Sequence, residues 1–74
     1  MTMRVAVVGT GLIGSRRAQV ARQYEGTEPV VIVSKSFERA ARLAAEVGAQ
    51  AATDWQTVVA RNDVDIVVVS TTNY

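Results

Sequence analysis

The chain has 74 residues, 49% of them hydrophobic, a formal net charge of +1, and neither cysteine nor histidine. This length allows one small domain or part of a larger one, and the composition excludes disulfides and thiolate or imidazole metal sites. The eight basic and seven acidic residues are scattered, unlike the basic stripe of a nucleic-acid binder. No apolar stretch approaches the roughly 18 residues of a membrane-spanning helix. We therefore expect a cytoplasmic protein that binds neither nucleic acid nor membrane.

The first half of the chain predicts a strand, a helix and a second strand. Residues 3–8 (MRVAVV) are typical of a strand buried on both faces of a parallel sheet. A helix is expected from Leu12 to about Tyr24. The next strand begins at Pro29, where no ladder donor is required, and continues through residues 30–34 (VVIVS). The side chains available to face the sheet from the helix are Leu12, Ile13, Val20 and Tyr24.

The second half repeats this alternation. Ser36 is expected to cap a helix from Phe37 to Val47 that Gly48 ends, and residues 49–52 form a weak third strand. Thr53 stands three residues before Gln56, a capping-box spacing that starts a short helix running to about Arg61. Residues 66–70 (IVVVS) form a fourth apolar strand. The side chains at helical spacing in the second helix are Phe37, Ala40, Ala41, Ala44 and Val47.

The order of these elements predicts an α/β fold. A β-α-β-α-β-α-β chain with short connections requires parallel strands, right-handed crossovers and helices on both faces of the sheet. No repeat or linker interrupts residues 1–74, so we expect one unit, the N-terminal part of a Rossmann-type dinucleotide-binding domain.

Three glycines follow the first strand in the spacing G-x-G-x-x-G. In a β-α-β unit, Gly9 is expected to make the tight turn, Gly11 to let the main chain approach a pyrophosphate, and Gly14 to let the helix pack against the strand. The free N–H groups of the helix would bind the phosphates. The alternative is a tight turn without a ligand. The predicted cofactor-binding residues of this loop are Gly9, Thr10, Gly11, Leu12, Ile13 and Gly14.

The end of the second strand indicates which dinucleotide binds. NAD sites usually have an Asp or Glu here, whereas this chain has Ser34 and Lys35. A hydroxyl and an ammonium can bind a 2′-phosphate through charge-assisted hydrogen bonds, so NADP is favoured over NAD. The alternative is that Lys35 only points into water. At the carboxyl end of the fourth strand, Thr71, Thr72 and Asn73 are expected to contact the pyrophosphate or the nicotinamide ribose. No residue is predicted to be catalytic.

The chain resembles the N-terminal domain of the Gfo/Idh/MocA family, which is named after glucose-fructose oxidoreductase, inositol dehydrogenase and rhizopine catabolism. The matching segments are RVAVVGTGLIG, SFERAARLAAEVGA and ATDWQTVVARNDVDIVVVSTTN, which together cover nearly the whole chain. The resemblance implies an NAD(P)-dependent oxidoreductase that passes hydride between the nicotinamide and a sugar, cyclitol or related alcohol. The chain departs from the family at Ser34, where aspartate is frequent, and at Thr72, where proline is usual.

The resemblance also implies that the catalytic machinery lies beyond Tyr74. The family's Glu-Lys-Pro motif, its acid/base pair and its substrate-binding sheet have no counterpart in these residues. We expect a small-molecule substrate to be bound by a further C-terminal domain, a homo-oligomer when the protein is complete, and no activity from these residues alone. Two alternatives are a non-catalytic NAD(P)-sensing module and an α/β methyltransferase with a similar glycine loop.

Overall fold

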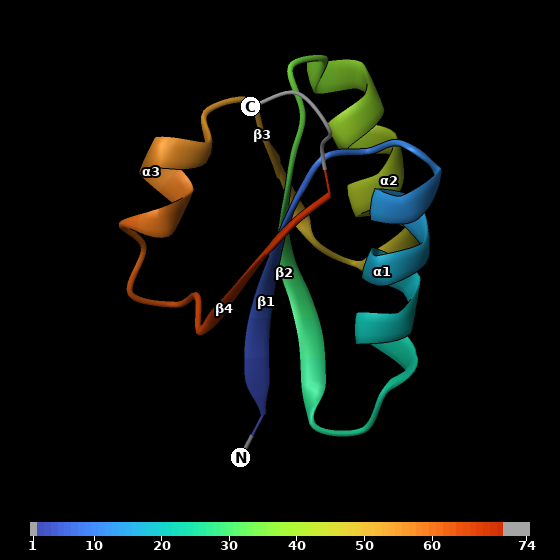
Figure 1. Ribbon diagram of the computed structural model, residues 1–74, viewed down its shortest axis with the longest axis vertical. Coiled ribbons are helices and arrows are strands. Elements are labelled where there is room, and N and C mark those ends of the chain that lie inside the picture. Colours follow the sequence, from blue (N-terminus) through green and yellow to red (C-terminus); the bar gives the residue numbers. More distant parts are fainter. Residues whose placement is uncertain (1, 71–74) are drawn as a thin grey trace.

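The computed structural model describes residues 2–70 and confirms the α/β fold. Four parallel strands form one sheet in the order β3-β2-β1-β4. Helices α1 and α2 cover one face of the sheet and α3 lies on the other (Figure 1). The elements are β1 (Met3–Val8), α1 (Leu12–Gln23), β2 (Thr27–Val33), α2 (Phe37–Val47), β3 (Gln50–Ala52), α3 (Trp55–Val59) and β4 (Ile66–Val69).

The two faces of the central strand β1 pack against different helices. Val5 and Val7 belong to a core with the buried residues of α1 and α2. Ala6 and Val8 pack on the other face with Val58 of α3. All four of these β1 side chains are at most 4% exposed, which explains why the strand is an uninterrupted apolar run.

Strand β2 begins earlier than its sequence suggests. It starts at Thr27, and Pro29 lies inside it rather than at its first position. The pairing with β1 shifts by one residue immediately after Pro29, and β3 pairs only from Val31 onward. Pro29 is therefore accommodated at an irregularity where β2 has no neighbour on its β3 side.

Helix α1 buries its small residues, and the expectation that its large apolar side chains face the sheet is wrong. The buried positions are Gly14, Ala18 and Ala21, which follow one another at helical spacing. A stripe of small side chains brings the helix axis close to the sheet. The large side chains are instead exposed: Leu12 76%, Ile13 55%, Val20 55% and Tyr24 67%.

Helix α2 has both of its predicted caps, whereas three other expectations for α2 and α3 are corrected. The Ser36 hydroxyl accepts a hydrogen bond from the Arg39 N–H, and Gly48 ends α2 in the left-handed conformation with φ 74°. Phe37, however, is exposed. The cap of α3 is Asp54 rather than Thr53, because the Asp54 carboxylate accepts the Gln56 N–H at 2.9 Å. Helix α3 also ends at Val59, before Arg61.

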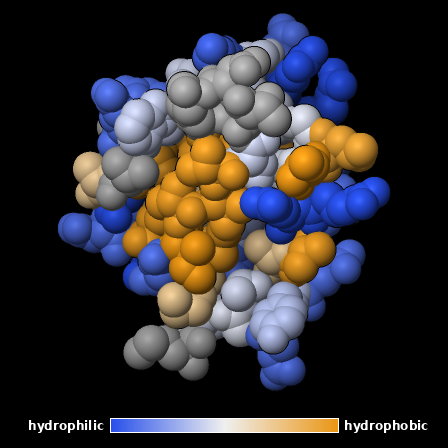
Figure 2. All heavy atoms as spheres, in the orientation of Figure 1, coloured by the Kyte–Doolittle hydropathy of each residue, from blue (hydrophilic) through white to orange (hydrophobic). Residues whose placement is uncertain are grey.

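Strand β4 is an edge strand with an apolar surface. Among the described strands it pairs with β1 alone, and Ile66, Val67 and Val69 are 38%, 37% and 52% exposed. A hydrophobic patch covers the corresponding part of the face seen in Figure 2. Asp65 fixes the start of strand β4, because its Oδ2 accepts hydrogen bonds from the Arg4 backbone N–H at 2.8 Å and from the Arg4 Nε–H at 3.2 Å.

Acid is expected to weaken the attachment of β4. The hydrogen bond from the Arg4 backbone, followed by that from its side chain, holds the pKa of Asp65 below its ordinary value. As the pH falls below about 4, Asp65 is protonated in the unfolded chain before it is protonated in the folded one. The stabilisation that these hydrogen bonds give the folded protein above that pH is therefore lost. Asp65→Asn should flatten the dependence of the melting temperature on pH below about 4, measured by circular dichroism of the full-length protein. Arg4→Met should flatten it less, because the backbone donor remains; an equal effect of both variants would contradict this assignment.

Candidate functional site

The glycine loop lies where β1 ends and α1 begins, at the carboxyl edge of the sheet. Gly9 has φ 113°, a conformation that side chains disfavour, and its N–H donates to the Val33 carbonyl at 2.8 Å. The chain therefore turns sharply after β1 while it remains tied to the end of β2.

Gly14 and Gly11 are glycines for different reasons. A Cβ on Gly14 would lie 2.2 Å from the Gly9 carbonyl oxygen and 2.8 Å from its carbon, so only a glycine lets α1 pack this closely on the loop. A Cβ on Gly11 would meet no atom of the described residues within 4 Å, and its φ of −67° suits any residue. Packing requires Gly14, whereas the space beside Gly11 is open for another molecule.

The N-terminus of α1 is open to an anion. Its cap residue Gly11 has no side chain to accept a first-turn N–H, and the first turn holds no acidic residue. The first N–H groups of a helix have no partner within the helix and carry its positive dipole end. In this position they can bind phosphate oxygens.

The end of β2 supplies a hydroxyl and two cations. Ser34 Oγ lies 3.2 Å from Thr10 Oγ1, which donates to it, and it also accepts the Ser36 N–H at 3.3 Å. Lys35 and Arg39 line the same cleft. The sequence analysis missed Arg39, although its position one turn into α2 could have indicated it, since a nearby arginine accommodates the 2′-phosphate in NADP sites.

The end of β4 contributes a buried hydroxyl. Among the described residues, Ser70 Oγ has no hydrogen-bond partner although it is buried, and Ser70 lines the cleft. Buried polar atoms normally have partners, so this hydroxyl is available to a bound group. Thr71, Thr72 and Asn73, the residues predicted to contact the cofactor here, lie outside the described residues.

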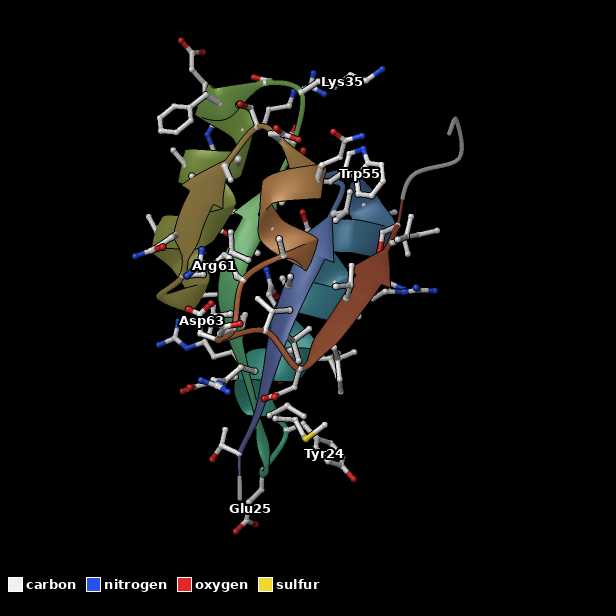
Figure 3. All side chains as sticks on the ribbon, turned by 90° about the vertical axis from the view of Figure 1, so that its left-hand side faces the viewer. Tyr24, Glu25, Lys35, Trp55, Arg61 and Asp63 are labelled. Carbon is white, nitrogen blue, oxygen red and sulfur yellow. The ribbon has the colours of Figure 1, made fainter. Side chains whose placement is uncertain are left out.

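These three strand ends surround one cleft of about 720 Å³. Lys35 and Trp55 lie at the same end of the molecule, opposite Tyr24 and Glu25 (Figure 3). Trp55 is 42% exposed and adds an aromatic ring to the lining, and none of the described residues in this lining is acidic. The lining residues are Val8, Gly9, Thr10, Gly11, Leu12, Ile13, Val33, Ser34, Lys35, Arg39, Thr53, Trp55 and Ser70.

A second groove of about 630 Å³ lies between α1 and β4. It is lined by the exposed apolar side chains of α1 and by Arg16, Arg17, Ile66 and Val68. Arg16 and Arg17 therefore line this groove and not the cleft that contains Gly11. This groove contains neither Gly9 nor Gly11, so the open N-terminus of α1 belongs to the first cleft.

Two further findings concern the described part of the chain. Within residues 2–70, no three His, Cys, Asp or Glu side chains come together as a metal site. The helices described for this chain are too short or too polar to span a bilayer.

Comparisons with known proteins agree with this geometry. An inositol 2-dehydrogenase of Saccharopolyspora erythraea is 41% identical over 71 residues, which are 93% of this chain and 21% of that protein. The structure of GenD2 from gentamicin A biosynthesis, in complex with NAD, matches with a TM-score of 0.89 and 30% identity over 95% of this chain and 20% of that one. The structure of a 3-ketoreductase from Actinomadura kijaniata, in complex with NADP and TDP-benzene, matches with a TM-score of 0.82 and 31% identity. This match covers 90% of this chain and 21% of that one.

The chain thus spans about a fifth of the length of these relatives. Residues 3–74 match the model of the Gfo/Idh/MocA family, described as an oxidoreductase family with an NAD-binding Rossmann fold. The match covers nearly the whole chain, including all the glycines of the loop and both flanking strands. The chain therefore belongs to the Gfo/Idh/MocA oxidoreductase family.

Proposed function

We propose that this chain is the first part of the cofactor domain of an NADP-dependent oxidoreductase acting on a sugar, cyclitol or related alcohol. The observation that carries the proposal is the cleft itself, which joins the open N-terminus of α1 to a hydroxyl and two cations at the end of β2. The substrate and its binding domain belong to the part of the protein outside these residues.

The residues of the cleft fit a dinucleotide. The space beside Gly11 accepts a group that approaches the main chain closely, and the N–H groups of α1 face it as phosphate donors. The Ser70 hydroxyl, which has no hydrogen-bond partner among residues 2–70, can donate to the same bound group from the β4 side. Hydride transfer is the chemistry that a bound nicotinamide would supply, and the residues described here bind and orient rather than react.

The preference for NADP follows from the side chains at the end of β2. Ser34, Lys35 and Arg39 offer one hydroxyl and two positive charges. A carboxylate in this place binds the ribose hydroxyls of NAD and would repel a 2′-phosphate, whereas an arginine nearby accommodates it. Among the neighbours, some structures contain NAD and others NADP, so the preference is inferred from this chain's own residues.

Lys35→Ala is expected to weaken NADP binding about tenfold, because it removes a charged donor to the 2′-phosphate. NAD, which has no phosphate at that position, should lose much less affinity. The measurement is isothermal titration calorimetry of both nucleotides with the full-length protein. Arg17→Ala is the matched control, since it removes one positive charge from the second groove and should leave both affinities unchanged. An unaltered ratio of affinities in Lys35→Ala would refute the role of this lysine.

Turnover separates an enzyme from a nucleotide-sensing module. The full-length protein should change the absorbance of the nicotinamide when it is mixed with NADP and a panel of polyols and sugars. Tight nucleotide binding without turnover of any panel member would favour the sensing module. Binding of adenosylmethionine in place of NADP would favour the methyltransferase.

A further inference from the structure

The Ser34 hydroxyl accepts two hydrogen bonds within the protein. Its oxygen accepts from Thr10 Oγ1 at 3.2 Å and from the Ser36 N–H at 3.3 Å. A serine hydroxyl has two acceptor sites and a single hydrogen. Both acceptor sites are therefore used inside the protein, and only the hydrogen remains for a ligand. Because Ser34 lines the cleft, it presents a donor there and no acceptor.

A donor at this position distinguishes the two nucleotides. A 2′-phosphate offers oxygens that accept hydrogen bonds, which a donor matches. The carboxylate of NAD sites instead accepts from the ribose hydroxyls, and a hydroxyl whose lone pairs are occupied cannot replace it. Resting on the NADP preference proposed above, we propose that Thr10 is a positioning residue that sets cofactor specificity by holding Ser34 as a donor.

The link between Thr10 and Ser34 is separable from the folding of the loop. The loop is tied to β2 by the main-chain bond from the Gly9 N–H to the Val33 carbonyl, at 2.8 Å. It is tied to α1 by the Ser15 hydroxyl, which donates to the Thr10 carbonyl at 3.4 Å. Neither bond uses the Thr10 side chain. Replacing Thr10 by a residue of the same shape therefore removes the contact to Ser34 and leaves these anchors in place.

The test compares Thr10→Val, which keeps the shape of threonine without its hydroxyl, with Thr10→Ser, which keeps the hydroxyl. Full-length wild type and variants are titrated with NADP and NAD, and with adenosine 2′,5′-bisphosphate and 5′-AMP, which differ by the 2′-phosphate alone. Thr10→Val should lower the NADP-to-NAD affinity ratio about threefold to tenfold, the effect of one neutral hydrogen bond. The ratio for the two adenosine probes should fall equally, and Thr10→Ser should stay within about twofold of the wild type.

The possible results distinguish a failure of the proposed NADP preference from a failure of the role of Thr10. A wild type that binds NAD more tightly than NADP refutes both the proposed preference and the role of Thr10. A wild type that prefers NADP, with a Thr10→Val variant that keeps the ratio, refutes the role of Thr10 alone. Parallel weakening of all four ligands would also overturn it, because it would show that Thr10 merely supports the loop. Circular dichroism checks the folding of Thr10→Val, and Thr10→Ala provides a second hydroxyl-free variant if valine disturbs it.

Discussion

Gly14→Ala is expected to destabilise the protein by about 3 kcal/mol and to abolish nucleotide binding. The added methyl group would lie 2.2 Å from the Gly9 carbonyl oxygen, far inside van der Waals contact. The obstacle is main chain, so rotation of a side chain cannot relieve it. Either α1 or the glycine loop has to move, and both line the end of the cleft where we propose that the phosphates bind. Chemical denaturation of the full-length protein measures the loss of stability.

Gly11→Ala is the matched control for this substitution. It adds the same methyl group three residues earlier, at the N-cap of α1, where no described atom lies within 4 Å and the backbone suits alanine. Its stability should change by no more than about 1 kcal/mol, the usual cost of alanine at a helix cap. Nucleotide binding should nevertheless weaken about tenfold or more, because the methyl occupies the space expected for the pyrophosphate. Full affinity in a folded Gly11→Ala protein would place the phosphates elsewhere.

Ser34→Asp is expected to reverse the cofactor preference. The new carboxylate would receive the two hydrogen bonds that Ser34 accepts now, from Thr10 and from the Ser36 N–H, so the site is already built to hold an acceptor. It would repel a 2′-phosphate and accept from the ribose hydroxyls of NAD. We expect NADP affinity to fall about 100-fold, since a pair of like charges at about 4 Å costs a few kcal/mol near a protein surface.

Ser34→Asn separates charge from size in this experiment. Asparagine has the shape of aspartate without its charge, so it should weaken NADP binding less than aspartate does and should not favour NAD strongly. Calorimetric titrations of both nucleotides with each variant measure the ratio. If Ser34→Asp still prefers NADP, the 2′-phosphate does not lie beside residue 34, and the assignment of this end of the cleft is wrong.

The strands and the glycine turn could be predicted from the sequence because each depends on local chemistry. An apolar β-branched run needs burial on both faces, and Gly9, Gly48 and the Ser36 cap each meet a requirement of their own segment. The face of α1 could not be predicted by the size of its apolar residues. The close approach at Gly14 requires small neighbours, so Ala18 and Ala21 are buried while Leu12 and Val20 are exposed.

Part of the cleft lining could be predicted from the sequence, and the rest could not. The loop and the end of β2 are adjacent in the fold because a β-α-β unit places them together, which sequence order alone implies. Arg39, Trp55 and Ser70 come from three other segments, and only the arrangement in space brings them to one cleft. The hydrogen bond between Thr10 and Ser34 joins residues 24 positions apart, and no sequence pattern indicates it.

The pairing of β1 with β4 has a consequence for the synthesis of the protein. These neighbours in the sheet are the first and the last described strands, so their contact waits for almost all of these residues to leave the ribosome. Until then a nascent chain has its glycine turn but lacks strand β4 and the side of the cleft that Ser70 lines. We therefore expect the proposed binding of the coenzyme to begin only after this whole segment has been translated, and a product terminated before residue 66 to lack it.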